Sequence, residues 1–350
     1  MPVTSRGLPV LGWDIGGVNT KAVRVSPRTG GISELECTSA PFEIQHDLAA
    51  LADTLAALAH RLGRADGWAH AITMTAELSQ AFRTKREGVG AVLDAVATAF
   101  PSDTIRVYTV AGQFVAPADA RARPLEVGAS NWVATATVVA RLAADAILMD
   151  IGTTSTDIIP IVGGRVAARG RTDPARLLSG ELVYTGAVRT PVEAAVREVP
   201  LWEGRAAVSA DGFATVGDAH VWLGALRPED YTGATSDRRP VTREAAGERL
   251  ARVVCGDREM LDEEAIDRIA HAVVEAQIEQ VTRGLRQVQQ AFPAARTAVV
   301  TGLGAFIAAA AARRAGLAVV SLADRWGEAA RVAPAAAVGW LLAEELGITR

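Results

Sequence analysis

Residues 14–21 read Asp-Ile-Gly-Gly-Val-Asn-Thr-Lys, and residues 150–157 read Asp-Ile-Gly-Thr-Thr-Ser-Thr-Asp. Each string follows an apolar run and leads into another, which predicts a strand, a glycine-bearing turn and a second strand. The recurrence of this unit indicates an internal duplication. Because glycine has no Cβ, the backbone N–H groups of such turns can approach an anion closely. We expect the two turns to face each other across a cleft that holds a phosphate or diphosphate and its metal ion.

The bulk composition excludes several classes of function. With 350 residues the chain is long enough for two domains, and its net charge of −4 gives no electrostatic case for nucleic acid. Cys37 and Cys255 fit no metal-binding spacing. No uninterrupted apolar run reaches the roughly 18 residues of a membrane span, and residues 1–7 lack the apolar core of a signal peptide. We therefore expect a soluble cytoplasmic protein with no membrane partner; a homo-oligomer remains possible.

Lysine occurs only at positions 21 and 85, although Lys and Arg together number 36. Where composition favours Arg so strongly, a retained Lys suggests a site that needs a compact ammonium group rather than a planar guanidinium. Lys21 closes the first glycine turn and is our candidate for neutralising charge during catalysis. Lys85 is a candidate substrate contact. The alternative is that both lysines are surface residues that survived by chance.

The periodicity of apolar residues predicts an α/β protein. Strands are expected at 10–15, 21–26, 31–37, 41–44, 70–74, 104–110, 146–151, 157–162, 165–168, 296–300 and 317–321. Helices are expected at 47–64, 86–100, 131–145, 241–255, 262–291, 307–315 and 333–346. We predict a first lobe of residues 1–130 completed by a C-terminal helix at 331–350. The second lobe, 131–330, carries an irregular insertion at about 170–240.

Three elements recur in a recognisable order: two acidic glycine turns and a late Gly-x-Gly turn at 301–305, between a strand and a helix. In this the chain resembles the sugar kinase, Hsp70 and actin superfamily of duplicated ribonuclease H-like domains. The resemblance implies an actin-like ATPase fold with an interlobe cleft. It also implies that the first two turns hold phosphates and metal, whereas the third holds a nucleoside. A single glycine turn would be weak support, but the order of all three is more specific.

A narrower resemblance rests on four strings, at 13–17, 73–78, 150–157 and 180–186. They are similar to the hydantoinase/oxoprolinase-like branch, and within it to the tetrahydromethanopterin-linked C1-pathway family of methanofuran biosynthesis. The segment from Thr172 to Pro191 is the most distinctive part, because kinases of the superfamily lack it. The resemblance implies a transferase that joins an aminomethyl-furanmethanol diphosphate to the phenol oxygen of γ-glutamyltyramine and releases diphosphate. It implies Mg²⁺ or another divalent cation; ATP binding is possible, but a requirement for ATP is not expected.

Such a reaction needs charge neutralisation on the leaving diphosphate and a base for a phenol whose pKa is about 10. The expected metal ligands are Asp14 and Asp150. The expected phosphate- or nucleotide-binding residues are Gly16, Gly17, Asn19, Thr20, Gly152, Thr153, Thr154, Ser155, Gly302 and Gly304. The catalytic candidates are Lys21, Glu77, Asp157 and Glu181. The substrate-binding candidates are Lys85, Asp173, Arg176, Tyr184 and Arg189. Glu77, Asp157, Asp173 and Glu181 all remain candidates for the base.

Two other functions compete with the synthase. An ATP-dependent small-molecule kinase or a lactam hydrolase is favoured by the late turn, since a diphosphate substrate has no evident need for an adenosine site. A nucleotide-dependent clamp or regulator would resemble the actin and chaperone relatives. Each candidate side chain also has a structural alternative. Asp14 and Asp150 could simply cap turns, Glu77 could be a surface charge, and Glu181 and Tyr184 could be ordinary loop residues.

Overall fold

The computed structural model describes residues 9–26 and 34–348. The chain divides into two compact units. Unit 1 contains residues 1–144, 163–166 and 322–350, and unit 2 contains residues 145–162 and 167–321. The division falls after the helix α5 (Asn131–Leu142) rather than at residue 130, because α5 packs against the C-terminal helix α13 (Ala333–Glu345) of unit 1.

Unit 1 is built on a mixed sheet with the strand order β3-β2-β1-β4-β5-β6. The strands are β1 (Val10–Ile15), β2 (Asn19–Ser26), β3 (Glu34–Pro41), β4 (Ala69–Met74), β5 (Thr104–Tyr108) and β6 (Phe114–Val115). The first three form an antiparallel meander, whereas β4 and β5 continue parallel to β1. The sequence predicted two strands at 31–37 and 41–44, whereas β3 is a single strand from Glu34 to Pro41. Residues 31–33 of the first predicted strand lie outside the described residues.

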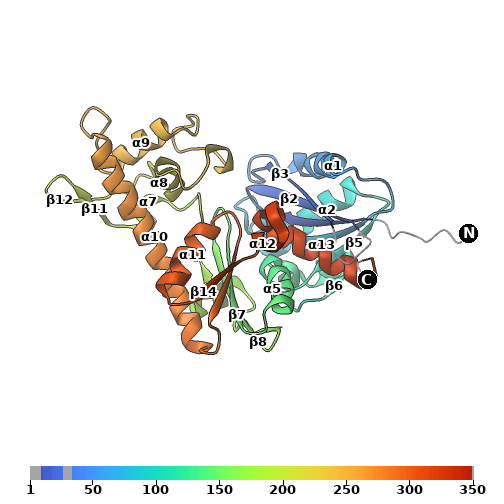
Figure 1. Ribbon diagram of the computed structural model, residues 1–350. Coiled ribbons are helices and arrows are strands. Elements are labelled where there is room, and N and C mark those ends of the chain that lie inside the picture. Colours follow the sequence, from blue (N-terminus) through green and yellow to red (C-terminus); the bar gives the residue numbers. More distant parts are fainter. Residues whose placement is uncertain (1–8, 27–33, 349–350) are drawn as a thin grey trace, which may run out of the picture. The chain divides into compact units, whose positions relative to one another are not determined.

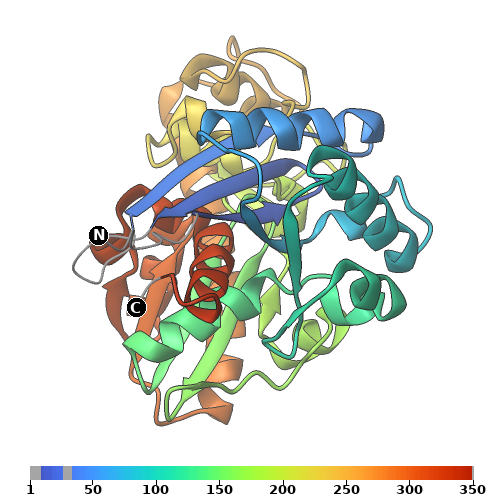
Figure 2. The same cartoon turned by 90° about the vertical axis from the view of Figure 1, so that its right-hand side faces the viewer.

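Helices cover both faces of this sheet (Figure 2). Successive side chains of a strand point to opposite faces, so those of β1 divide between the two. Leu11, Trp13 and Ile15 enter a core with the helices α1 (Leu51–Arg61) and α2 (Lys85–Ala99). On the opposite face Gly12 lies so close to α13 that a Cβ would stand 2.0 Å from the backbone oxygen of Ala335. A larger residue at position 12 would therefore hold the helix away from the sheet. The expected helix 47–64 is shorter than predicted, since a 3₁₀ turn at Leu48–Ala50 precedes α1.

The remaining elements of unit 1 are short connections. They are the 3₁₀ turn η2 (Ala76–Leu78), α3 (Pro117–Ala122), α4 (Pro124–Val127), β9 (Arg165–Val166), α12 (Ala323–Trp326) and the 3₁₀ segment η4 (Gly327–Val332). The turn η2 follows β4 directly, at its carboxyl end, where α/β proteins commonly place ligand-binding groups.

Unit 2 repeats the same strand pattern, in the order β10-β8-β7-β13-β14. The strands are β7 (Ala146–Ile151), β8 (Thr156–Val162), β10 (Leu182–Val183), β13 (Thr297–Thr301) and β14 (Ala318–Ser321). The first hairpin is antiparallel, and β13 and β14 run parallel to its first strand, as β4 and β5 run parallel to β1 in unit 1. The sheet of unit 1 has β6 as an additional, antiparallel edge strand. The order β3-β2-β1-β4-β5 thus matches the order β10-β8-β7-β13-β14, as expected for a duplication.

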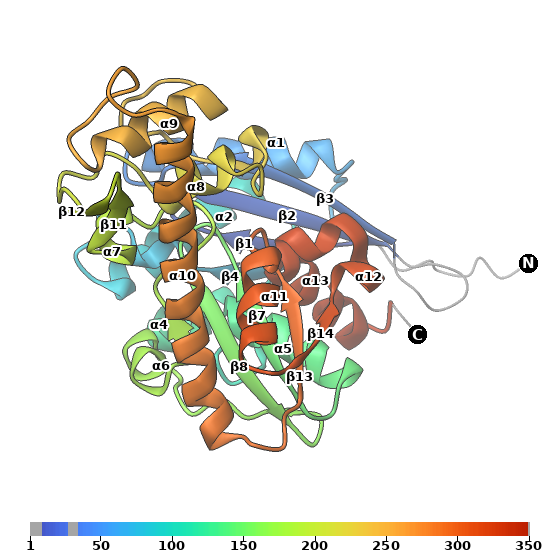
Figure 3. The same cartoon turned by 60° about the vertical axis from the view of Figure 1, so that its left-hand side comes forward.

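The helix α10 (Glu263–Ala291) spans two cores of unit 2 (Figures 1 and 3). Its C-terminal half packs with α11 (Ala305–Arg314) over β7. Its N-terminal half belongs to a second core, formed with the insertion. The insertion contains α6 (Asp173–Ser179), α7 (Val192–Ala195), the hairpin β11 (Glu198–Leu201) and β12 (Gly204–Ala207), α8 (Val216–Trp222) and the 3₁₀ turn Pro228–Asp230. The helix α9 (Arg243–Arg252) follows it. Within residues 170–240 the elements are short and joined by loops, and together with α9 and the N-terminal half of α10 they form a core of their own.

Candidate functional site

The first glycine turn joins β1 to β2 in unit 1. Asp14 stands opposite Lys21 in the strand register, and the amide of Gly16 donates to the carbonyl of Asn19 at 3.0 Å. The ammonium of Lys21 lies 3.3 Å from Oδ2 of Asp14, which is only 5% exposed. The other oxygen, Oδ1, is buried with no hydrogen-bond partner among the described residues. A buried carboxylate oxygen without a partner is costly, and a divalent cation is one group that would satisfy it.

Glu77 and Lys85 form a second acidic–basic pair in unit 1. Glu77 lies in η2, after β4, and its side chain is fully buried. Lys85 begins α2, and its Nζ lies 3.2 Å from Oε1 of Glu77. The Lys85 side chain keeps 26% of its surface exposed. A buried carboxylate held by a partly exposed ammonium can exchange a proton with a bound molecule, so both residues remain candidates.

The second glycine turn, in unit 2, has the geometry of the first. Asp150 stands opposite Asp157, as Asp14 stands opposite Lys21, and the amide of Gly152 donates to the carbonyl of Ser155 at 3.0 Å. The repeats differ at their closing residue, which is a lysine in the first and a carboxylate in the second. Asp150 is 6% exposed and is the last residue but one of the buried strand β7.

The late Gly-x-Gly turn packs directly on this second turn. Thr301 pairs with Asp150 in the parallel register of β13 and β7. Gly302 has φ +85°, and a Cβ there would stand 2.4 Å from Oδ1 of Asp150. The amide of Gly304 donates to the carbonyl of Ile151 at 2.8 Å. Asp150 and the late turn therefore form one structural feature at the carboxyl ends of two parallel strands, where ligands bind in α/β folds.

Three predicted residues of unit 2 form a buried ionic group. Arg176 donates from Nη1 to Asp157 at 2.6 Å and from Nη2 to Asp173 at 2.9 Å. Burial alone would lower the pKa of Arg176, but the two carboxylates outweigh it and the pKa is raised. Because the guanidinium is committed to these partners, the geometry favours an internal role for Arg176 over the predicted contact with substrate. Asp157 is correspondingly less suited to act as a base.

Glu181 is fully buried, and its two carboxylate oxygens accept hydrogen bonds from the amides of Arg169 and Gly170, at 2.6 and 2.8 Å. This arrangement holds the loop before α6 and favours a structural role over the predicted catalytic one. Tyr184, in contrast, is 59% exposed, and Arg189 is exposed as well. Both can reach a ligand in solution, so both remain candidates for substrate binding.

Sequence reasoning missed the part that residues 185–190 play in shaping the second turn. The carbonyl of Gly152 accepts from the amide of Ala187 at 2.9 Å, and that of Thr153 accepts from the amide of Arg189 at 2.9 Å. Gly186 lies so close that a Cβ would stand 2.5 Å from the amide nitrogen of Thr154. The available signal was Gly186 itself, the last residue of the string 180–186.

The metal-binding prediction can be compared with the donor groups present. Over residues 9–26 and 34–348 no group of three or more His, Cys, Asp or Glu side chains is placed to hold a metal ion. The residues fit a site in which Asp14 or Asp150 supplies one oxygen, since Mg²⁺ bound beside a phosphate group usually keeps waters and substrate oxygens as its other ligands.

The comparisons with known proteins agree with this architecture. A family model described as hydantoinase/oxoprolinase matches residues 69–345. A protein of Methanocaldococcus jannaschii is 33% identical over 342 residues, covering 96% of this chain and 98% of that protein, and is named (4-{4-[2-(γ-L-glutamylamino)ethyl]phenoxymethyl}furan-2-yl)methanamine synthase. The chain belongs to the hydantoinase/oxoprolinase family, in the group of this synthase. That membership confirms the narrower resemblance inferred from the sequence.

Two further comparisons are consistent with that assignment. A Methanococcus vannielii protein with the same synthase name is 31% identical over 205 residues, 57% of this chain and 91% of that protein. Among solved structures, nucleotide-free acetone carboxylase aligns with a TM-score of 0.57 and 13% identity, over 95% of this chain and 70% of that one. At this identity the likeness concerns the fold alone, and it supports the actin-like ATPase class. Within the described residues, no helix is both long and apolar enough to cross a bilayer.

Proposed function

We propose that this chain catalyses the synthase reaction of its relatives in methanofuran biosynthesis. In this reaction the phenol oxygen of γ-glutamyltyramine bonds to the CH₂ of an aminomethyl-furanmethanol diphosphate. The C–O bond to the diphosphate breaks, diphosphate leaves, and the phenol proton passes to a base. The observation that carries the proposal is the 33% identity to the M. jannaschii synthase over 96% of this chain and 98% of that protein.

Each of the two glycine turns offers groups of the kind that the leaving group requires. A furan ring stabilises positive charge on the attached CH₂, so the main task of the protein is to neutralise the departing diphosphate. Backbone amides of the turns at 16–17 and 152–154, and the ammonium of Lys21, are suited to it. Loss of one such contact typically raises a barrier by about 3 kcal/mol. In unit 1 the orphaned Oδ1 of Asp14, and in unit 2 the buried carboxylate of Asp150, is each suited to hold Mg²⁺, which would add positive charge beside a bound diphosphate.

Among the four candidate bases, the partners of each side chain favour Glu77. Glu181 is held by two backbone amides, and Asp157 and Asp173 share the guanidinium of Arg176. Glu77 is paired with Lys85, whose flexible ammonium can move as the charge on its partner changes. We therefore propose that Glu77 accepts the phenol proton and that Lys85 stabilises the ionised carboxylate or phenolate.

Two exposed residues of the segment from Thr172 to Pro191 are suited to bind the γ-glutamyl end of the substrate. Arg189 is exposed, follows the turn-binding segment directly, and can bind a γ-glutamyl carboxylate through two parallel hydrogen bonds. Tyr184, also exposed, offers an aromatic face and a hydroxyl donor.

The proposal is tested by measuring diphosphate release from purified full-length protein with Mg²⁺, γ-glutamyltyramine and the furanmethanol diphosphate. Release that needs both substrates and no ATP is the expected result. A parallel reaction contains ATP with each unphosphorylated partner. No release in the first reaction together with ADP formation in the second would refute the synthase proposal.

The second candidate function, an ATP-dependent kinase or lactam hydrolase, is favoured by one observation in unit 2. The late turn at Gly302–Gly304 packs against Asp150, the arrangement expected if a nucleotide were held beside a metal ligand. We propose instead that this turn fixes the positions of Asp150 and its neighbours, or binds part of the furan substrate. ADP formation in the parallel reaction is the result that would favour the kinase or hydrolase.

A further inference from the structure

A chain of buried hydrogen bonds connects the middle of α10 to the second glycine turn. Gln277 is fully buried, and its Nε2 donates to the hydroxyl of Thr185 at 3.0 Å and to the carbonyl of Gly186 at 2.7 Å. The Thr185 hydroxyl also contacts that of Thr190 at 2.9 Å, and the Thr190 hydroxyl accepts from the amide of Gly186 at 3.2 Å. Gln277 thus holds the first two residues of the segment 185–190 directly, and its last residue, Thr190, through them.

The segment 185–190 is hydrogen-bonded to the second glycine turn. Between its two ends, the amides of Ala187 and Arg189 donate to the carbonyls of Gly152 and Thr153. When turn carbonyls are bonded from this side, the peptide planes are fixed, and so are the directions of the N–H groups that would face an anion. One side chain on α10 is therefore only two hydrogen bonds away from the turn backbone, although 125 residues or so separate them in sequence.

His220 fixes the orientation of the Gln277 amide. Its Nε2 lies 2.8 Å from Oε1 of Gln277. Because the other end of that amide must donate to the Gly186 carbonyl, Oε1 is an acceptor and Nε2 of His220 carries the hydrogen. The imidazole is fully buried, and burial lowers its pKa to about 4, so the ring is neutral near pH 7. It also packs edge-on against Phe306 of α11, with ring centroids 5.0 Å apart.

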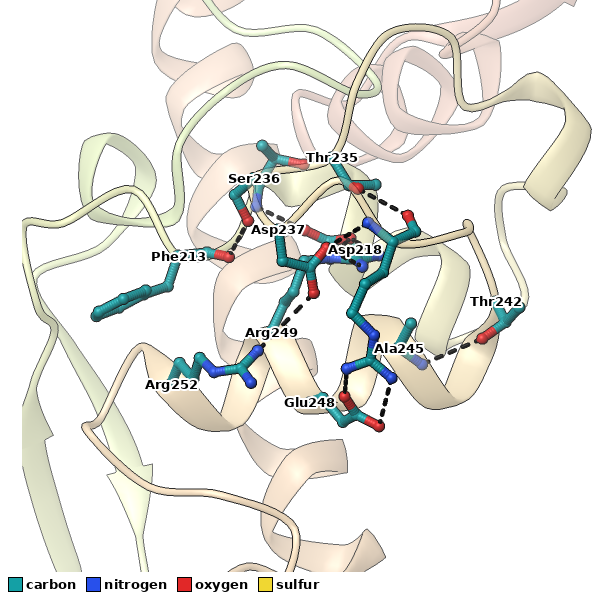
Figure 4. Close-up of polar contacts among 12 residues, drawn as sticks. Phe213, Asp218, Thr235, Ser236, Asp237, Thr242, Ala245, Glu248, Arg249 and Arg252 are labelled. Carbon is teal, nitrogen blue, oxygen red and sulfur yellow. Dashed lines mark hydrogen bonds and ion pairs between the residues drawn. The ribbon is translucent and has the colours of Figure 1, made fainter.

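The helix α8, which carries His220, is itself held from its other side (Figure 4). Two residues before His220, Asp218 caps the helix through the amide of Thr215 and accepts from Nε of Arg249 at 2.9 Å. Positions two apart on an α-helix point to nearly opposite faces. Arg249 also donates to Asp237 at 3.1 Å, which brings the loop before α9 into the same cluster. The ionic cluster therefore fixes the helix, while His220 faces Gln277.

We propose that Gln277, oriented by His220, is a positioning residue for the second glycine turn and sets its affinity for the diphosphate group of the substrate. The inference rests on the proposed function for its ligand, but the geometry of the turn can be measured without it. Gln277 touches no reacting atom in this account, and it acts only through Thr185, Gly186 and the amides that follow them.

The test compares Gln277→Leu with Gln280→Leu. Gln280 lies one turn further along α10 and also donates to backbone carbonyls, those of Ala194 and Ala195, at 2.9 and 3.2 Å. It makes the same kind of contact with a segment that does not touch the glycine turn. For each variant and the wild type, hydrogen exchange is measured at the amides of Ala187 and Arg189. Binding of inorganic diphosphate in the presence of Mg²⁺ is measured by calorimetry on the same samples.

We expect Gln277→Leu to speed hydrogen exchange at both amides and to weaken diphosphate binding, each by about tenfold or more. Changes of this size are usual when buried polar groups lose their hydrogen-bond partners. The control should change neither quantity. Equal exchange in Gln277→Leu and Gln280→Leu would overturn the positioning role. Absence of diphosphate binding by the wild type would count against the proposed function alone, since the exchange comparison still decides the positioning role.

A second variant covers the case in which Gln277→Leu fails to fold. Gln277→Glu keeps the shape of the side chain and the acceptor for His220, but places a carboxylate oxygen opposite the Gly186 carbonyl. Because ionisation makes this contact repulsive, we expect diphosphate affinity to fall further as the carboxylate loses its proton with rising pH. The wild type should show no matching step. A pH profile parallel to that of the wild type would contradict the proposed role.

Discussion

Replacing Gly186 by alanine should disturb the second glycine turn by an amount that the structure defines. A Cβ at this position would stand 2.5 Å from the amide nitrogen of Thr154 and 2.6 Å from the carbonyl carbon of Thr153. Ordinary van der Waals contacts of a Cβ begin near 3.4 Å. Both atoms belong to the backbone, so no side-chain rotation can relieve the overlap, and the turn or the segment must move by about 1 Å. Overpacking of this kind typically costs about 1–3 kcal/mol of folding free energy.

The effect on function should exceed the effect on folding. A misplacement of about 1 Å in a group that orients a reacting substrate can reduce rate by about 100-fold. We therefore expect Gly186→Ala to lower kcat/KM for diphosphate release by about two orders of magnitude, while the protein still unfolds cooperatively. The assay is diphosphate release with Mg²⁺ and both substrates, accompanied by thermal unfolding of the same preparation.

The matched control is Gly204→Ala in the β12 strand of the same unit. A Cβ at Gly204 would meet no atom within 4 Å, so the same chemical change falls in open space. This variant should keep the wild-type rate and stability. A Gly186→Ala protein with wild-type kcat/KM would refute the reasoning, because it would show that the geometry of residues 152–155 does not limit the reaction.

Four further predictions concern side chains whose surroundings the structure defines. Asp150→Asn should abolish diphosphate release yet leave the circular dichroism spectrum unchanged, and a wild-type rate would remove Asp150 from the mechanism. Lys21→Arg should lower the rate of diphosphate release although the charge is kept, and an unaltered rate would exclude a close contact between Lys21 and diphosphate. Arg249→Met leaves Asp218 buried without its ionic partner and should cost about 3–5 kcal/mol in urea unfolding, a loss that Asp218→Asn in the same chain should partly restore. Stability should also fall between about pH 6.5 and 4, because burial lowers the pKa of His70 to about 4, so the unfolded chain binds a proton that the folded one does not.

The predicted pH dependence of stability rests on the buried side chain of His70. His70 accepts a hydrogen bond from the indole of Trp13 at 3.1 Å and lies 2.8 Å from Asp103, so its folded form is the neutral tautomer with hydrogen on Nε2. The pKa difference corresponds to about 3 kcal/mol lost by pH 4. His70→Gln should flatten the dependence of unfolding free energy on pH over this window. A slope equal to that of the wild type would mean that other groups cause it.

The sequence alone predicted the elements whose signals are local. Glycine turns after apolar runs located the β1–β2 and β7–β8 hairpins, and the apolar stripe at helical spacing located α10 to within one residue of its start. The order of the three glycine turns indicated the duplicated fold, and that expectation is confirmed by the family match and by the shared strand order. Such features depend on spacings of a few residues, which the chain displays directly.

Only the tertiary structure decided which charged side chains are committed to one another. Arg176, Asp157 and Glu181 carry the right chemistry for catalysis or substrate binding, but their partners lie in other elements and engage them internally. The hydrogen bonds that link Gln277 to the second turn could not be predicted from the sequence either, because no local sequence pattern marks a buried glutamine on an amphipathic helix. Hydrogen bonds satisfy buried polar groups across any sequence distance, so a residue's role follows from the packing that surrounds it.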